Sequence, residues 1–294
     1  MKKVKILTDS CCDLPKKIRD KYDIDYFKMR LDYKGKEVVA DLDWEFASAR
    51  EFFDYMRDGN KITPKPVPIR EFENKFREYV DKGYDIVYIA CASKLSTAFA
   101  TASSVANELT KEYPNNKIIC VDSLNACMGE GMLVIEACEL KELGYDAEEI
   151  ADKIISERNY VHQIGTFNNL DLLKEAGKVR SADAFFGNLF KIKPIVTSSG
   201  NGEDFDLKVV KGRQESLKEI VKMLKDRLVD SENQIVYIMH SDCLIDAMTL
   251  QEEIISQIKC RDILIYSFGP VTAAAVGHGL VALYAFEKDT ESME

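Results

Sequence analysis

The sequence predicts an α/β protein whose first half is built around a parallel β-sheet covered by helices. Three runs rich in apolar, strand-forming residues support this prediction, at residues 5–10, 85–93 and 117–123. Uninterrupted apolar runs are typical of strands buried on both faces, as in a parallel sheet. Each run ends at a hydroxyl or acidic residue. Because such sheets bind ligands beyond the carboxyl ends of their strands, these polar ends mark the expected site.

Length and charge set the broad class of the protein. At 294 residues the chain is long for one domain, and two domains are expected. The net charge of −10 argues against nucleic acid as a partner, because neutralising phosphates needs a basic surface. No apolar stretch is long enough to span a bilayer, and the first residues lack the features of a signal peptide. We therefore expect a cytoplasmic protein without stable membrane insertion.

The eight cysteines fit the same compartment. They form no Cys-x-x-Cys pair, and most lie within apolar segments. In a chain of this size such cysteines are typically reduced and buried, whereas a disulfide scaffold is typical of small secreted domains.

Strands and helices alternate in the first half of the chain. The strand at residues 3–8 leads to a helix for which Asp13 is the expected N-cap, with Pro15 in its first turn. Residues 26–31 alternate between apolar and charged side chains, which predicts a half-buried strand. An amphipathic helix is expected over residues 44–56.

The remaining elements follow from the same periodicities. In the first half, helices are expected over residues 69–80, 96–111, 129–143 and 144–158. In the second half, we expect helices over 168–176, 183–191, 215–228 and 243–258, strands at 234–239, 263–266 and 280–286, and a hairpin joining 193–196 to 207–210. The change in pattern near residue 160 suggests an N-terminal α/β domain, residues 1–160, and a mixed α/β C-terminal domain, residues 161–294.

Small hydroxyl side chains at the expected carboxyl edge of the sheet indicate a site for an anion. Ser93 and Ser96 follow the second apolar run, and Thr63 lies in the proline-rich residues 61–68, which are expected to be rigid and extended. Hydroxyl groups and the free N–H groups of a helix N-terminus suit a carboxylate or phosphate. Ser96 could equally be only the N-cap of the next helix, and Thr63 only an exposed turn residue. For Ser96 both roles are compatible, because a capping hydroxyl lies beside those free N–H groups.

Motifs for metal binding or a catalytic triad are weak. His162, His240 and His278 are far apart in the sequence and show no metal-ligand spacing. His240, Ser241 and Asp242 are neighbours, but adjacent residues of an extended chain point in opposite directions. Ser241 and Asp242 are instead expected to cap the following helix.

Cofactor and nucleophile motifs are equally weak. Gly129-x-Gly131 and Gly277-x-Gly279 each lack the third glycine of a dinucleotide-binding fingerprint. Cys11 and Cys12 lie between a strand and a helix, where a thiolate could be stabilised, but the sequence offers no paired base. No catalytic residue, metal site or cofactor is therefore predicted.

Taken together and in this order, several short segments resemble the DegV family of bacterial fatty-acid-binding proteins. They are Thr8-Asp9-Ser10 with Asp13-Leu14, Thr63, Ser93-Lys-Leu-Ser96, Val121-Asp122-Ser123, Asn169-Leu170 leading to Gly177-Lys-Val, Lys191-Ile-Lys-Pro194, and Phe268-Gly-Pro-Val271 leading to Gly277-x-Gly279. The resemblance extends over about residues 4–286, nearly the whole chain.

The resemblance implies a two-domain protein that holds one long-chain fatty acid in a tunnel between its domains. Residues 1–160 would carry the head-group site, with the carboxylate against Thr63, Ser93 and Ser96, and residues 161–294 would close the acyl tunnel. Several family members are the acyl-carrying subunit of a bacterial fatty acid kinase. They present the carboxylate to an ATP-dependent partner, which converts it to an acyl phosphate.

The sequence also departs from the family pattern. A histidine that family members carry near the carboxylate aligns with Ala275, so Lys65 or His278 could replace it as the electrostatic partner. The family loop Thr-Ser-Gln-Pro is Thr63-Pro-Lys-Pro66 here, and the Gly-Thr after Ser96 is Thr97-Ala98. Family arginines that would face the kinase fall near basic residues of this chain, which are Lys178, Arg180, Lys211 and Arg213.

Two other functions use the same loops. A sensor of lipids or small carboxylates would bind the ligand without acyl transfer. A phosphotransfer or hydrolytic enzyme would need a base, a metal or a phosphate-binding lysine in a glycine-rich loop, and the sequence supports none of these convincingly. We therefore expect a carrier without catalytic activity of its own.

Overall fold

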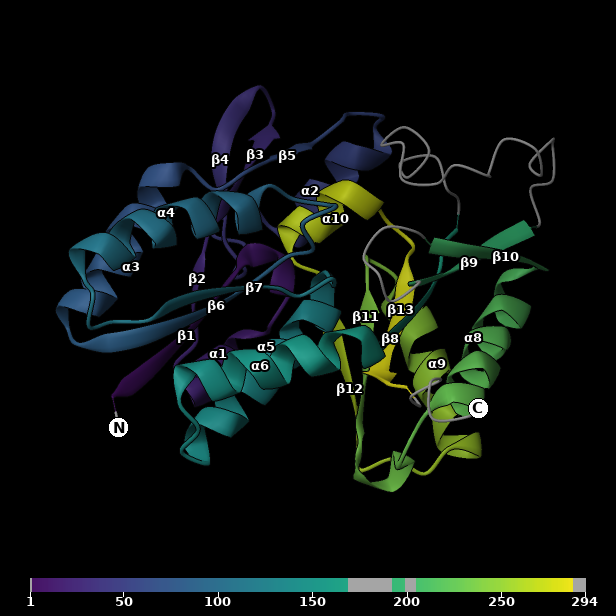
Figure 1. Cartoon of the computed structure of the whole chain (residues 1–294). Coiled ribbons are helices and arrows are strands. Elements are labelled where there is room, and N and C mark those ends of the chain that lie inside the picture. Colours follow the sequence, from purple (N-terminus) through teal and green to yellow (C-terminus); the bar gives the residue numbers. More distant parts are fainter. Residues whose placement is uncertain (1, 169–191, 199–204, 288–294) are drawn as a thin grey trace. The chain divides into compact units, whose positions relative to one another are not determined.

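The computed structural model describes residues 2–168, 192–198 and 205–287 (Figure 1). The chain divides into two compact units. Unit 1 comprises residues 1–48, 61–159 and 269–271, and unit 2 comprises residues 49–60, 160–268 and 272–294. The helices predicted over 168–176 and 183–191 lie, apart from Asn168, outside the described residues, as do Lys178 and Arg180.

The predicted parallel sheet is confirmed in unit 1. Its four strands are β1 (Lys3–Asp9), β2 (Asp25–Phe27), β6 (Tyr84–Ala90) and β7 (Ile118–Asp122), in the order β2-β1-β6-β7. All three pairings are parallel. Residues of β1 and β6 are buried almost throughout, as expected for strands covered on both faces.

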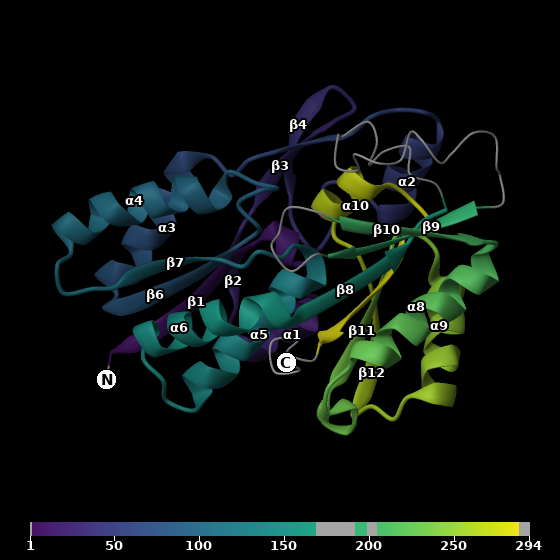
Figure 2. The same cartoon turned by 45° about the vertical axis from the view of Figure 1, so that its right-hand side comes forward.

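Helices cover both faces of this sheet (Figure 1). One layer contains α3 (Ile69–Asp81) and α4 (Ala98–Glu112). The other contains α1 (Lys16–Tyr22), α5 (Cys127–Glu142) and α6 (Ala147–Glu157), and Figure 2 shows the same two layers from a second side. Short 3-10 helices lie at η1 (Ser10–Cys12) and η2 (Arg158–Tyr160).

Aromatic rings fill the space between the sheet and the first layer. Phe72 and Phe76 lie one turn apart on α3, so they share a face. Both pack against Phe27 of β2 and Tyr88 of β6, and all four are fully buried. The ring centres of Phe27 and Phe72 are 4.3 Å apart, within contact distance for aromatic pairs.

A small antiparallel sheet in unit 1 corrects one prediction and agrees with another. It consists of β4 (Lys36–Ala40), β3 (Met29–Tyr33) and β5 (Thr63–Lys65), in that order. The single strand predicted over residues 26–31 is therefore two strands in two sheets, separated at Lys28. The proline-rich stretch is an edge strand in part, where the missing N–H of Pro64 is tolerated.

The start of α2 also differs from its prediction. The helix extends over Ala49–Arg57, five residues shorter at its N-terminus than the predicted 44–56. Trp44 has a φ of 58°, which is left-handed backbone and cannot continue into a right-handed helix. The amphipathic pattern is kept within α2, where Phe52, Phe53 and Met56 are buried.

Unit 2 is built on a mixed six-stranded sheet. Its strands are β8 (Val161–Thr166), β9 (Ile192–Ser198), β10 (Phe205–Lys211), β11 (Ile235–His240), β12 (Asp262–Ser267) and β13 (Val281–Phe286), in the order β10-β9-β8-β13-β11-β12. The predicted hairpin of β9 and β10 is confirmed. Among these neighbours β11 and β12 are parallel, and the other pairs are antiparallel.

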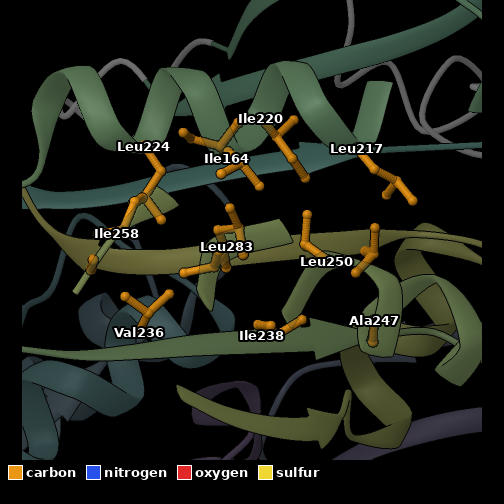
Figure 3. Packing of buried hydrophobic residues seen from close by; sticks show 14 of the residues in the cluster. Ile164, Leu217, Ile220, Leu224, Val236, Ile238, Ala247, Leu250, Ile258 and Leu283 are labelled. Carbon is orange, nitrogen blue, oxygen red and sulfur yellow. The ribbon is translucent and has the colours of Figure 1, made fainter. Parts of the chain in front are cut away.

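The core of unit 2 lies between this sheet and its helices, α8 (Arg213–Arg227) and α9 (Leu244–Gln257). Leu217, Ile220 and Leu224 recur at helical spacing on α8 and point toward Ile164 of β8 and Leu283 of β13 (Figure 3). A further helix, α10 (Pro270–Val276), and a 3-10 helix, η4 (Ser231–Asn233), complete the described elements.

Candidate functional site

The carboxyl ends of β1 and β6 meet where the strand order of the parallel sheet reverses. Asp9, the last residue of β1, is fully buried there. Its carboxylate accepts hydrogen bonds from the Cys11 amide (2.9 Å), the Cys91 amide (3.2 Å) and the Tyr88 hydroxyl (3.0 Å). Burial raises the pKa of Asp9, and these hydrogen bonds oppose the rise. Asp9 therefore ties the two strand ends together at the position where open α/β sheets bind ligands.

The loop between β6 and α4, residues 91–97, is held by the neighbouring strand end. The Ser93 amide donates to Asp122 Oδ1 (3.0 Å), and the Ala92 amide donates to the Asn125 carbonyl (2.8 Å). The Ser96 amide closes the loop on the Ala92 carbonyl (3.0 Å). These contacts fix the backbone that carries both predicted serines.

The two serine hydroxyls have different surroundings. Ser96 Oγ accepts a hydrogen bond from the Ala98 amide (3.2 Å), but the N-cap of α4 is Thr97, one residue after the predicted position. Ser93 is exposed, and within the described ranges its hydroxyl has no hydrogen-bond partner in the chain. An anion beside this loop would find that hydroxyl and the N-terminal end of α4 together.

Thr63 and Lys65 lie on β5, in the same unit but on the small antiparallel sheet. Thr63 is exposed and opposite Asp32. No hydrogen bond between described residues joins it to either serine. The ammonium of Lys65 is 3.1 Å from Glu37 Oε2 and 3.9 Å from Asp32 Oδ2. Two carboxylates therefore already balance the charge of Lys65.

His278 lies in unit 2, in the turn between Gly277 and Gly279. Both glycines have positive φ, 72° and 84°, which glycine adopts without strain. His278 is an exposed residue, and the partial burial of its ring together with the positive charge of Arg57 lowers the pKa of His278. The shift favours the neutral ring, which can act as a hydrogen-bond partner rather than as a cation.

Arg213 makes several contacts within unit 2, and its docking role stays a prediction. Its side chain is 14% exposed, and the guanidinium pairs with Asp246 (2.9 Å). It also donates to the carbonyls of Thr166 (2.9 Å) and Gly279 (3.0 Å). These contacts join α8, α9, the end of β8 and the glycine turn. Lys211, by contrast, is exposed.

The role predicted for Asp13 is wrong. Pro15 precedes α1 as its N-cap without a side-chain bond, and Asp13 has a left-handed φ of 51°. Asp13 Oδ1 instead accepts a hydrogen bond from the Gly269 amide (2.9 Å). A Cβ atom on Gly269 would come within 2.7 Å of that oxygen and 2.8 Å of Leu42 Cδ2, so only glycine fits. The Gly269-Pro270 pair was the one sequence signal of this turn.

The sequence also showed no sign of a second buried carboxyl group near Asp9, that of Glu130. Glu130 on α5 is fully buried, and its Oε1 accepts a hydrogen bond from the Thr8 hydroxyl (2.6 Å). Its other oxygen has no partner among the described residues. Burial, followed by the nearby charge of Asp9, raises the pKa of Glu130 well above its usual range. Burial at this position therefore disfavours the charged form of the carboxyl group.

The thiols and the His-Ser-Asp sequence offer no nucleophile. Contact with Cys91 and burial raise the pKa of Cys11 well above its usual value, and burial does the same for Cys12. Both therefore stay protonated and unreactive. Ser241 donates to the Gly277 carbonyl and Asp242 pairs with Arg57, so the prediction that they cap α9 is wrong.

Three observations bear on the wider chemistry. All eight cysteines are free thiols. Among the described residues, no group of three His, Cys, Asp or Glu side chains is placed to hold a metal ion. No helix in the described part of the chain has the length and apolarity needed to cross a membrane.

Comparison with known proteins gives one consistent relationship. A family model described as "Uncharacterised protein, DegV family" matches residues 3–288. A DegV domain-containing protein of Clostridium perfringens is 34% identical over 291 residues, which cover 99% of each chain. A second such protein, from Clostridium acetobutylicum, is 31% identical and covers 79% of this chain and 81% of its own.

Solved structures share the fold. A DegV family protein from Thermus thermophilus, described for its fatty acid binding, superposes with a TM-score of 0.86 at 24% identity, covering 97% of this chain and 100% of its own. A DegV lipid-binding protein from Thermotoga maritima gives 0.84 at 24% identity, with 98% and 99% covered. The Bacillus subtilis DegV, a fatty acid binding protein, gives 0.79 at 20% identity, with 98% and 100% covered.

These matches confirm the family resemblance seen in the short segments of the sequence. Because the family model spans nearly the whole chain and the Clostridium perfringens relative is 34% identical along its length, the chain belongs to the DegV family.

Proposed function

We propose that this protein is a cytoplasmic carrier that binds a long-chain fatty acid and presents its carboxylate to an ATP-dependent kinase. The observation that carries the proposal is the β6–α4 loop. Its backbone is held by Asp122 and Asn125, and it offers an exposed Ser93 hydroxyl beside the start of α4. Ser93, Ser96 and Thr63 would bind the carboxylate.

The energetics suit a fatty acid. Burying roughly fourteen methylene groups at about 0.8 kcal/mol each contributes on the order of 11 kcal/mol before the costs of binding. The head group then needs only a few hydrogen bonds to fix its orientation. The solved family members described as fatty acid binding support the same ligand class.

The kinase step would come from a partner. In the described part of this chain, Cys11 and Cys12 are protonated thiols, and the carboxyl groups of Asp9 and Glu130 are buried against protein groups. None of these is a base aimed at a bound carboxylate. Exposed Lys211 remains a candidate contact for the partner, together with Lys178 and Arg180 outside the described residues.

Ligand identity and site can be tested together. Mass spectrometry of protein made in bacteria should find a co-purified fatty acid. Direct titration should show that Ser93→Ala, and Ser96→Ala combined with Thr63→Ala, each weaken binding at least tenfold, since a hydrogen bond to a charged group contributes about 1.5–3 kcal/mol. Ser104→Ala, an exposed serine on α4, is the control. Unchanged affinity in the site variants would refute the assignment.

The electrostatic partner can be resolved in the same titration. Lys65→Ala and His278→Ala remove the two candidates one at a time. The ion pairs of Lys65 and the lowered pKa of His278 favour a neutral hydrogen bond from His278 over a lysine charge. If neither variant weakens binding, the carboxylate has no such partner.

A second assay tests whether the chain forms acyl phosphate alone or only together with a kinase. Purified protein with fatty acid and Mg-ATP should form no acyl phosphate, and adding the cell's fatty acid kinase should produce it. Turnover by the chain alone would contradict the carrier proposal. Fatty acid binding without product in the presence of the kinase would favour a sensor.

A further inference from the structure

A pocket lies at the edge of the parallel sheet opposite the β6–α4 loop. It has a volume of about 330 Å³, at the lower end of small-molecule sites. It is formed where β1 and β6 begin, next to the turn between α5 and α6, and Figures 1 and 2 both place that turn near the start of β1. All its residues belong to unit 1. From Lys5, the last pocket residue on β1, to Asp9 at the carboxyl end of the strand the chain runs four residues, roughly 13 Å.

The charge of this pocket is opposite to that of the whole protein. Four lysines line it, Lys2, Lys3, Lys5 and Lys141, with Asp23 as the one acidic residue. The net charge of the chain is −10. A local concentration of positive charge on an acidic protein is a feature of sites that attract anions.

Two of the four lysines have their charge balanced. The buried ammonium of Lys5 donates to the carbonyl (2.7 Å) and to Oδ2 (2.6 Å) of Asp23. These two hydrogen bonds use two of its three N–H groups. Lys2 is 3.6 Å from the carboxylate of Asp85. The ammonium groups of Lys5 and Lys2 are therefore held by carboxylates of the chain.

The other two lysines are not balanced. Lys141 makes one long hydrogen bond, 3.4 Å, to the Tyr22 carbonyl. The Lys3 ammonium lies 5.9 Å from the ring centre of Tyr84. Among the described residues, neither ammonium has a carboxylate within 4 Å. Two unpaired positive charges therefore border one pocket.

Two aromatic side chains line the wall together with Val4 and Gly144. Tyr84 begins β6, and Tyr145 follows Gly144, whose φ of 91° makes the turn after α5. Tyr145 is 39% exposed. These rings offer an apolar surface to an organic group attached to the anion.

We propose that this pocket binds a phosphate group, carried either by a small organic metabolite or by a lipid head group. A phosphate monoester carries nearly two negative charges at neutral pH, which match the two unpaired ammonium groups of Lys3 and Lys141. Lysine binds phosphate as a point charge, without the planar geometry that arginine imposes. The proposal does not depend on fatty acid binding at the other edge of the sheet.

The test compares two charge-matched double variants of the full chain. Lys3→Ala with Lys141→Ala removes the unpaired pocket charges. Lys16→Ala with Lys111→Ala removes the same total charge from helices outside the pocket, where both lysines pair with neighbours on their own helix. Thermal unfolding checks that both variants are folded.

Inorganic pyrophosphate is the first probe, titrated calorimetrically at low ionic strength. Binding should weaken at least tenfold in the pocket variant and stay within twofold of wild type in the control. Flotation with vesicles that contain phosphatidic acid, a lipid phosphate monoester, is the second probe. Vesicle binding that only the pocket variant loses would assign the phosphate to a lipid head group. If the two variants behave alike in both assays, the proposal is wrong.

Discussion

The buried carboxyl group of Glu130 should make the stability of the protein depend on pH. Its raised pKa means that the folded protein keeps a proton that the unfolded chain releases above the usual glutamate pKa. The stability from this group is present at low pH and is lost as pH rises through its folded pKa. Stability should therefore fall with rising pH in this window, by at most about 1.4 kcal/mol per pH unit for one proton.

We predict that Glu130→Gln flattens this dependence. Glutamine keeps an oxygen to accept the Thr8 hydrogen bond but cannot ionise. Denaturant unfolding from pH 5 to pH 9 should show a smaller loss of stability in the variant than in wild type. Some dependence should remain, because the pKa of Asp9 is also raised. Glu108→Gln, on the exposed face of α4, is the control, and parallel curves for all three proteins would contradict the prediction.

Arg213 supports a second residue-scale prediction. Its guanidinium makes three directed contacts, to Asp246, Thr166 and Gly279, which a single ammonium cannot reproduce. Arg213→Lys should therefore destabilise the protein by about 2–3 kcal/mol in denaturant unfolding. Arg227→Lys, with a side chain 51% exposed, should change stability by less than about 0.5 kcal/mol. Wild-type stability in Arg213→Lys would show that these contacts contribute little.

At the scale of elements, α5 approaches the β1–α1 connection more closely than a side chain would allow. A Cβ atom on Gly131 would lie 2.6 Å from the Cys12 carbonyl oxygen and 2.9 Å from Leu14 Cδ2. The glycine of the Gly129-x-Gly131 motif therefore serves helix packing, in agreement with the absence of a dinucleotide fingerprint.

Whether Gly131→Ala stabilises or destabilises the protein tests this packing. Replacing a helical glycine with alanine normally stabilises the helix, by up to about 1 kcal/mol. At Gly131 the clash with backbone should dominate, and Gly131→Ala should destabilise the protein by about 1–3 kcal/mol. A rise in the denaturant midpoint would mean that α5 can move away without cost.

At the scale of the whole molecule, the two units exchange short segments. Residues 49–60 belong to unit 2 although they lie within the first half, and residues 269–271 belong to unit 1. The hydrogen bond from the Gly269 amide to Asp13 is one contact between residues 269–271 and the rest of unit 1. A division of the chain near residue 160 would therefore separate residues 269–271 from the rest of unit 1, and residues 49–60 from the rest of unit 2.

We predict that a fragment of residues 1–160 is unstable alone. It lacks Gly269 for Asp13, and it carries α2, whose buried Phe52 and Phe53 would lose their packing in unit 2. Alone, it should bind a hydrophobic dye and unfold at a lower denaturant concentration than the full chain. Co-expression with residues 161–294 should restore much of the stability. A fragment as stable as the full protein would contradict the prediction.

The sequence by itself determined the elements that carry a strong local pattern. The apolar runs of β1, β6 and β7 predicted a parallel sheet, because burial on both faces requires apolar side chains throughout. Helical spacing predicted α3, α5 and α8 to within a few residues. The ends of the buried strands also pointed to Ser93 and Ser96, since a parallel sheet gathers its loops at one edge.

Tertiary structure alone decided the features that depend on distant partners. His162, Gln163 and Gly165 interrupt the apolar residues of β8, which is a strand because β9 and β13 pair with it. Asp13 looked like a helix cap because an acidic residue before a proline suits one locally. Its actual partner, Gly269, is 256 residues away in the sequence. A local pattern reports how a segment is buried, but it carries no information on which distant group completes its hydrogen bonds.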